Sequence, residues 1–113
     1  MADEEVFPGK LVCVMGENGA SGAWNRKYED CDAGALPISP ALRERLEAWC
    51  GGYGDIEEIE FEQGCADWGP YAAEGLAIAR AVKAELRDWT VFYYDEAKAR
   101  MKPPETARYE ILD

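Results

Sequence analysis

The stretch that most constrains the fold is residues 68–96, where a helical pattern passes directly into a strand pattern. Gly69-Pro70 is typical of a helix start, because proline fits the first turn, where its missing N–H would be unpaired anyway. Strand-forming residues follow Asp88, apolar on both faces of an extended chain, which is typical of a central strand. We therefore predict a helix over 70–87 and a central strand over 89–94. The buried face of that helix is expected to consist of Ala72, Gly75, Leu76, Ala79, Val82 and Leu86.

Gly75 is the unusual residue on this helical face. Glycine in a helix interior costs about 1 kcal/mol relative to alanine. We interpret it as a place where another part of the chain approaches the helix closely. The simpler alternative is a tolerated, mildly unfavourable residue.

Length and composition indicate one domain over 1–113, with an ordered core over about 8–112. No apolar run is long enough for a membrane helix, and the acidic start MADEEVF lacks the apolar segment of a secretion signal. We expect a cytoplasmic protein, with disorder only at Met1–Glu5 and around Lys102–Thr106.

The chain has four cysteines and no histidine. The lack of histidine excludes Ser-His-Asp triads, histidine general bases and histidine metal ligands. No C-x-x-C spacing occurs, so a structural zinc site would need all four cysteines to converge. We expect free thiols, with Cys13 as a core residue, and neither a metal nor a cofactor. The cysteines are Cys13, Cys31, Cys50 and Cys65.

Residues 10–15 are β-rich and apolar on both faces, which predicts a second central strand. The glycine-rich loop 16–22 contains the turn signal Asn18-Gly19, and residues 23–28 could return as an edge strand. A phosphate-binding loop is the alternative, but no Gly-Lys-Ser/Thr follows and Glu17 would repel a phosphate. The pattern favours a hairpin.

A serine followed by proline at 39–40 predicts the N-cap and first residue of a second helix, over 40–50. The glycines at 51–52 are expected to end it, with a left-handed cap available to them. The polar connection 29–36 before this helix lacks the ligand periodicity of a calcium loop, so we interpret it as a solvated turn. The buried stripe of the helix is expected to be Leu42, Leu46 and Trp49.

Three short motifs resemble those of small acidic bacterial proteins of uncharacterised function. They are L-P-I-S-P at 36–40, E-G-L-A at 74–77 and V-x-Y-x-D-E at 91–96. The likeness spans about residues 9–96, and the chain departs from it at the loop 16–22, where bulkier residues are expected. The resemblance implies a shared architecture and no particular activity, cofactor or functional residue.

Residues 53–67 are the most unusual segment in composition. From Leu46 to Ala79 there are eight acidic residues and no basic one, so this part carries −8 of the net charge of −11. Such a run is most often a solvated face; the sharper hypothesis is an acidic surface for a basic partner, such as a nucleic-acid-binding toxin. We expect Ile56, Ile59 and Phe61 to anchor it, as a short helix or an extended segment. The predicted partner-binding residues are Asp55, Glu57, Glu58, Glu60, Glu62 and Asp67.

We expect an α+β fold: a small, mostly antiparallel sheet of three or four strands with two main helices on one face. After the strand 89–94 we expect a helical turn and a last strand over 107–112. Two helices cover one face, yet both central strands are apolar on both faces. The second face is expected to be covered either by a second copy or partner, or by the termini and residues 97–106. The predicted self-association face is Val12, Val14, Phe92 and Tyr94.

These patterns favour a non-enzymatic protein-binding module that recognises a basic protein, as an immunity protein, an inhibitor or a nucleic-acid mimic would. The alternative is a self-associating structural or accessory protein whose acidity serves only solubility. A net charge of −11 argues against direct binding of nucleic acid or an anionic membrane. A glycosidase-like carboxylate pair has little support, because no carboxylate stands in an apolar context with a companion. We expect a basic protein partner or a homodimer.

Overall fold

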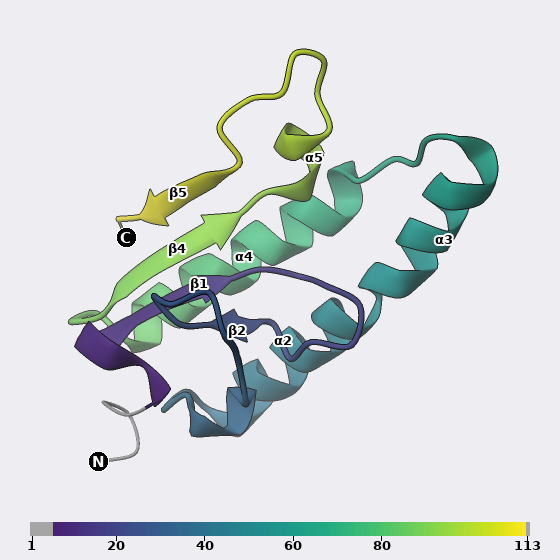
Figure 1. Cartoon of the computed structure of the whole chain (residues 1–113). Coiled ribbons are helices and arrows are strands. Elements are labelled where there is room, and N and C mark those ends of the chain that lie inside the picture. The colour runs from purple at the N-terminus through teal and green to yellow at the C-terminus, as the bar shows by residue number, and fades with distance from the viewer. Residues whose placement is uncertain (1–5, 113) are drawn as a thin grey trace.

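A five-stranded sheet carries two long helices on one face in the computed structural model, which describes residues 6–112 (Figure 1). The predicted α+β class is confirmed, with five strands where three or four were expected. The expected disorder at Met1–Glu5 lies outside the described residues. The strands are β1 (Leu11–Val14), β2 (Ala23–Trp24), β3 (Asp30–Cys31), β4 (Thr90–Tyr94) and β5 (Arg108–Ile111), in the order β3-β2-β1-β4-β5.

One strand pair in this sheet is parallel. β1 and β4 run side by side in the same direction, and the other three pairs are antiparallel. A parallel pair needs a long crossover connection, and the longer helices of the chain lie in that connection. These helices are α2 (Pro40–Gly51), α3 (Tyr53–Gln63) and α4 (Gly69–Glu85); the single turn α5 (Glu96–Ala99) follows β4.

The predicted start of α2 is confirmed. The Ser39 hydroxyl accepts the backbone N–H of Leu42. Ser39 in turn donates its backbone N–H and its hydroxyl to the Glu85 carboxylate, at 2.7 and 2.9 Å, which ties the start of α2 to the end of α4. The side chains of the predicted stripe, Leu42, Leu46 and Trp49, are buried.

The left-handed cap expected after α2 is wrong. Gly52 has a right-handed φ of −80°, and α3 begins at the next residue. The chain turns from one helix into another at this point, so it does not need the reversal that a left-handed residue provides. A left-handed glycine instead ends α3, where Gly64 has a φ of 84°.

The core lies between α4, α2 and the helix-covered face of the sheet, and Gly75 is at its centre. The Tyr93 hydroxyl donates to the Ala72 carbonyl at 2.8 Å, and the Trp49 indole donates to the Tyr71 carbonyl at 2.9 Å. A Cβ at position 75 would collide with both the Trp49 ring and the Tyr93 hydroxyl. The interpretation of Gly75 as a site of close approach is therefore confirmed.

The four residues of the predicted self-association face do not lie on the same face of the sheet, so this prediction is wrong. Val12 and Val14 align with Val91 and Tyr93 in the parallel register, and all four are fully buried on the side of the helices. Side chains alternate along a strand, so Phe92 and Tyr94 lie on the opposite face, where they are half-buried.

The chain covers part of that opposite face with its own residues. The Arg108 guanidinium lies 4.1 Å from the ring centroid of Phe92 and 5.3 Å from that of Tyr28. Cys13 is buried on this face, as expected of a core residue. The expectation that residues 97–106 fold across it is wrong, because the loop after α5 extends away from the sheet (Figure 1).

The cysteines and the lengths of the helices can be compared with the expectations from the sequence. The four cysteines are free thiols, three of them buried and Cys65 exposed. Within residues 6–112, no helix is both long and apolar enough to cross a membrane.

Replacing Gly75 with alanine should destabilise the fold. Helix propensity alone would favour alanine by about 1 kcal/mol. Overpacking typically costs about 1–3 kcal/mol, and here the Cβ would come within 3.0 Å of both the Trp49 ring and the Tyr93 hydroxyl, so we take about 2–3 kcal/mol and expect a net loss of about 1–2 kcal/mol. Urea unfolding at pH 7 measures this difference. Gly51→Ala is the matched control, since a Cβ at that helical position meets nothing within 4 Å. Equal or higher stability of Gly75→Ala would contradict the packing argument.

Candidate partner-binding surface

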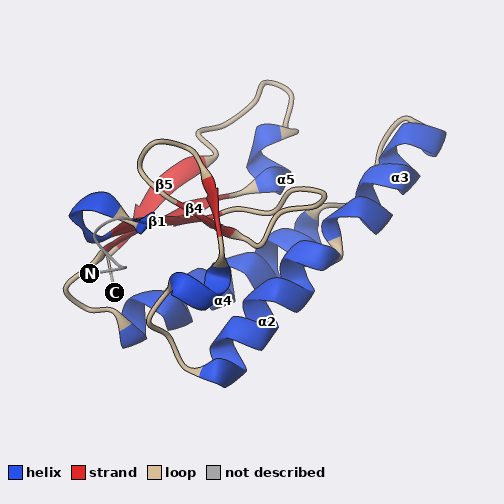
Figure 2. Ribbon diagram, turned by 60° about the horizontal axis from the view of Figure 1, so that its bottom comes forward, coloured by secondary structure: helices blue, strands red, loops and turns tan. Residues whose placement is uncertain are grey.

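The acidic segment forms the helix α3, which extends from the body of the molecule (Figure 2). The sequence pattern did not decide between a helix and an extended conformation for residues 53–67. Asp55 in the first turn is favourable near the positive end of the helix dipole, and Gly64 supplies the left-handed stop. The described chain is accordingly elongated, with extents of 45 × 24 × 23 Å.

Few side chains attach α3 to the body. Positions 53, 56 and 60 share its inner side at spacings of three and four residues. The Tyr53 ring packs against the Trp68 and Tyr71 rings, with centroids 5.0 and 6.0 Å apart. Ile56 is partly buried against the core, as expected.

The anchoring role expected of Ile59 and Phe61 is wrong. Ile59 is 45% exposed and Phe61 is 88% exposed. Both fall outside the inner side of the helix, because that side is set by Tyr53, which packs against the body. The segment therefore presents apolar as well as acidic side chains to the surroundings.

Glu60 has a structural role that the other acids of α3 lack. Its carboxylate accepts the Nε–H of Arg100 at 2.7 Å and the indole N–H of Trp68 at 3.0 Å. Arg100 also pairs with the buried Glu96 of α5, and its guanidinium lies 4.0 Å from the Trp68 ring centroid. Hydrogen bonding to Arg100 lowers the pKa of Glu60, whereas burial raises the pKa of Glu96. Arg100 thus joins α3, α5 and the start of α4.

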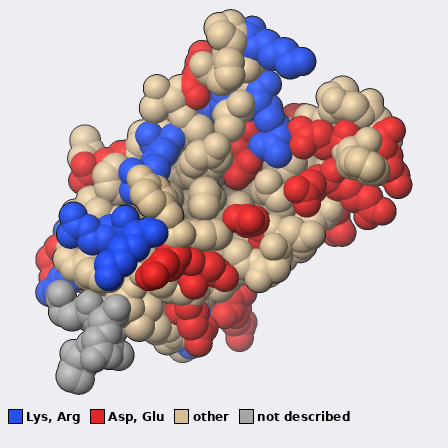
Figure 3. Space-filling view, viewed as in Figure 1, with Lys and Arg blue, Asp and Glu red and all other residues tan. Residues whose placement is uncertain are grey.

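The remaining acids of α3 form the exposed surface, which we call the acidic ridge. Among the described residues, the ridge carboxylates form no salt bridge. Figure 3 shows acidic side chains gathered over α3, while basic side chains gather elsewhere on this face. Asp67 is exposed too, but it lies in the loop beyond α3 and accepts the N–H of Gly69 at the start of α4. The acidic ridge consists of Asp55, Glu57, Glu58 and Glu62.

The glycine-rich loop packs against the end of α2, next to the start of α3. The predicted hairpin is confirmed: the Met15 N–H donates to the Gly22 carbonyl, and Ala20 closes the turn with Glu17. The Cys50 thiol donates to the Ala20 carbonyl at 3.2 Å, so the loop packs on the end of α2.

A shallow hollow of about 410 Å³ lies beside the ridge. It joins the loop 16–22 to one flank of α3, and its lining combines two ridge carboxylates with an exposed aromatic ring. The sequence pattern did not indicate this combination, because Phe61 was expected to anchor the segment to the body. The lining residues are Asn18, Gly54, Glu57, Glu58 and Phe61.

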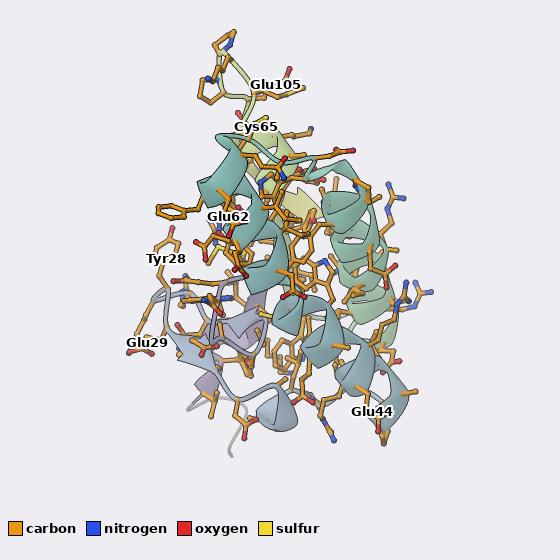
Figure 4. All side chains as sticks on the ribbon, turned by 90° about the vertical axis from the view of Figure 1, so that its right-hand side faces the viewer. Tyr28, Glu29, Glu44, Glu62, Cys65 and Glu105 are labelled. Carbon is orange, nitrogen blue, oxygen red and sulfur yellow. The ribbon has the colours of Figure 1, made fainter. Side chains whose placement is uncertain are left out.

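A second hollow, of about 430 Å³, lies between the end of α3 and the loop after α5. Its lining includes Cys65, Arg100 and Pro104. Figure 4 shows Glu62 on the outer side of α3 and Cys65 at the end of the molecule that carries Glu105. Among residues 6–112, no group of three or more Cys, Asp or Glu side chains could hold a metal ion.

Replacing Glu60 with glutamine should destabilise the protein in a pH-dependent way. The folded-state pKa of Glu60 lies below its ordinary value of 4.5, so its carboxylate stabilises the fold above that pH, and this contribution is lost as the pH falls through the folded-state pKa. We expect a loss of about 1–2 kcal/mol at pH 7 that shrinks toward about pH 3. Urea unfolding at a series of pH values measures it. The exposed Glu57→Gln is the control, and an equal loss in both variants would contradict the assigned role of Glu60.

Comparison with known proteins gives one match. A sequence model of a family described as Serratia CdiI immunity protein-like matches residues 10–96, from the start of β1 through the start of α5. No curated protein and no solved structure matches the chain.

Proposed function

The chain belongs to the Serratia CdiI immunity protein-like family, and we propose that it is an immunity protein that neutralises a basic protein toxin by binding it through the acidic ridge. The family match carries this proposal, since it spans β1 to β4 together with α2, α3 and α4, and leaves out β5. An immunity protein acts by binding a partner protein, and binding alone can cover or distort the partner's working surface.

The charge of the ridge supports a basic partner. Asp55, Glu57, Glu58 and Glu62 are exposed on one helix and engage no cation of their own chain among the described residues. A toxin that acts on nucleic acid needs a positively charged surface for the phosphates. The ridge would complement such a surface, accelerate the encounter and fix the orientation of the complex.

Self-association is a second proposal, favoured by the outer face of the sheet. Phe92 and Tyr94 are only half-buried there, and Tyr28 is 67% exposed. Arg108 covers part of the Phe92 ring and would form the rim of such a contact. Sedimentation equilibrium at high concentration tests this proposal, and the mass of one chain would count against it.

Neutralising the ridge should remove partner binding. We expect bait protein with Asp55→Asn, Glu57→Gln, Glu58→Gln and Glu62→Gln to recover much less of a basic protein from the native host at low salt than the unmodified bait does. Recovery by the unmodified bait should itself fall as salt rises, because ions screen exposed charges beyond about 10 Å at 0.1 M. Glu60 is left intact because it binds Arg100.

The matched control removes four exposed acids elsewhere: Glu44→Gln, Glu47→Gln, Glu105→Gln and Glu110→Gln. This control has the same net charge as the ridge variant and should recover the partner as the unmodified bait does. Equal recovery by all three baits would contradict a role of the ridge in binding and would leave it as a solvated surface.

A further inference from the structure

We propose that Phe61 is the apolar anchor of the partner interface, and that it inserts into an apolar pocket of the toxin bordered by lysine or arginine. This inference rests on the proposed function and adds what the partner must present. The acidic ridge specifies the charge of the partner surface but not its shape. A single aromatic ring at a fixed position also requires a pocket of matching shape on the partner.

The exposure of Phe61 is the first observation. Its side chain is 88% exposed, the highest value among the large apolar residues that the structure describes as exposed. Burying a phenylalanine side chain is favourable, and folding leaves nearly all of that stabilisation available for binding because the ring stays exposed. Aromatic residues that fill a partner's pocket are typical hot spots of protein interfaces.

The surroundings of Phe61 specify the rim of the pocket. Glu57 lies one helical turn before it, and Glu57 and Glu58 share the lining of the 410 Å³ hollow with the ring. Docking Phe61 would bring these carboxylates into the interface, where a desolvated charge is costly unless it is paired. The partner pocket must therefore have an apolar floor and a cationic rim.

The position of Phe61 is fixed before binding. Arg100 joins Glu60, one residue before Phe61, to Glu96, and the Tyr53 ring packs on Trp68 at the other end of the helix. The Asn18 side chain of the glycine-rich loop also lies close to the start of α3, because a Cβ added at Gly54 would come within 3.1 Å of it. A phenylalanine on a fixed helix has few rotamers to lose, so little ordering opposes binding.

The charge pattern favours a toxin over a second copy or a membrane. A second copy offers an apolar hollow with Arg100 and Lys102, but this hollow adjoins α3 and includes Glu60. Docking there would bring two acidic helices together, and like charges in an interface are unfavourable. An anionic membrane would repel the same carboxylates.

The test compares Phe61→Ala with Leu112→Ala, using as the probe the purified basic protein that the unmodified bait recovers from the native host. Recovery of no basic protein by that bait would overturn both the proposed function and this inference. Leu112 is the matched control, since it is 77% exposed and lies at the end of β5, away from α3. We expect Phe61→Ala to weaken affinity at least about ten-fold at both about 50 and about 300 mM NaCl, with the salt dependence of the wild type. Leu112→Ala should bind within about two-fold of the wild type. Titration calorimetry measures both, and urea unfolding should show unchanged stability for Phe61→Ala.

Each alternative result of these experiments would contradict a specific part of the proposal. Wild-type affinity in Phe61→Ala, together with weakened binding by the ridge variant, would reject the anchor and leave the proposed function standing. Wild-type affinity in both variants would reject the ridge as well. A wild-type dimer in sedimentation that Phe61→Ala dissociates would make a second copy the occupant and overturn the inference.

Discussion

The packing of Trp49, Tyr71 and Tyr93 around the first turns of α4 positions the rest of the structure. Trp49 comes from α2 and stacks on Tyr71 with centroids 4.6 Å apart, and Tyr93 reaches the same turns from β4. Both the Trp49 indole and the Tyr93 hydroxyl donate to backbone carbonyls of α4. These hydrogen bonds fix the orientation of the two rings as well as their position in the core. Gly75 permits this arrangement because it leaves the space that the two rings occupy.

The same ring cluster extends outward and determines where α3 stands. Trp68 packs edge-on against Tyr71, and Tyr53 at the start of α3 packs against both rings. Arg100 then lies over Trp68 and binds Glu60 and Glu96. Within residues 6–112 these contacts attach the helix along one side, and its acidic side chains at 55, 57, 58 and 62 are exposed. A binding surface on a helix held in this way requires little reorganisation on association.

The acidic residues between positions 55 and 67 differ in role although the sequence presents them as one run. Glu60 is half-enclosed by Arg100 and Trp68, and those contacts stabilise the attachment of the helix. Asp67 accepts a backbone N–H at the entry to α4. The other four carboxylates are exposed and border Phe61 or the outer side of the helix. The proposed recognition of a basic partner rests on these exposed carboxylates and on the exposed ring beside them.

The sequence by itself determined the elements that depend on near neighbours. The serine-proline start of α2, the Asn18-Gly19 turn and the succession of a helix and a strand around residue 88 follow from local geometry, and the structure confirms them. The helix ends at Glu85, two residues before the predicted end, and a short turn precedes the strand at Thr90. Gly75 could be recognised as a packing site because its cost in a helix needs a compensating contact.

Only the tertiary structure decided which distant groups meet. Alternation along β1 and β4 shows that each strand has two faces, but the parallel register decides that Val12 lies on the same side as Val91 and not Phe92. The partner of Glu60 is Arg100, 40 residues later in the chain, and no local pattern joins them. Phenylalanine is typical of a protein core, but Phe61 is exposed because Tyr53, Ile56 and Glu60 occupy the side of α3 that faces the body. Local sequence sets the conformation of a segment, whereas long-range packing sets which of its sides is buried.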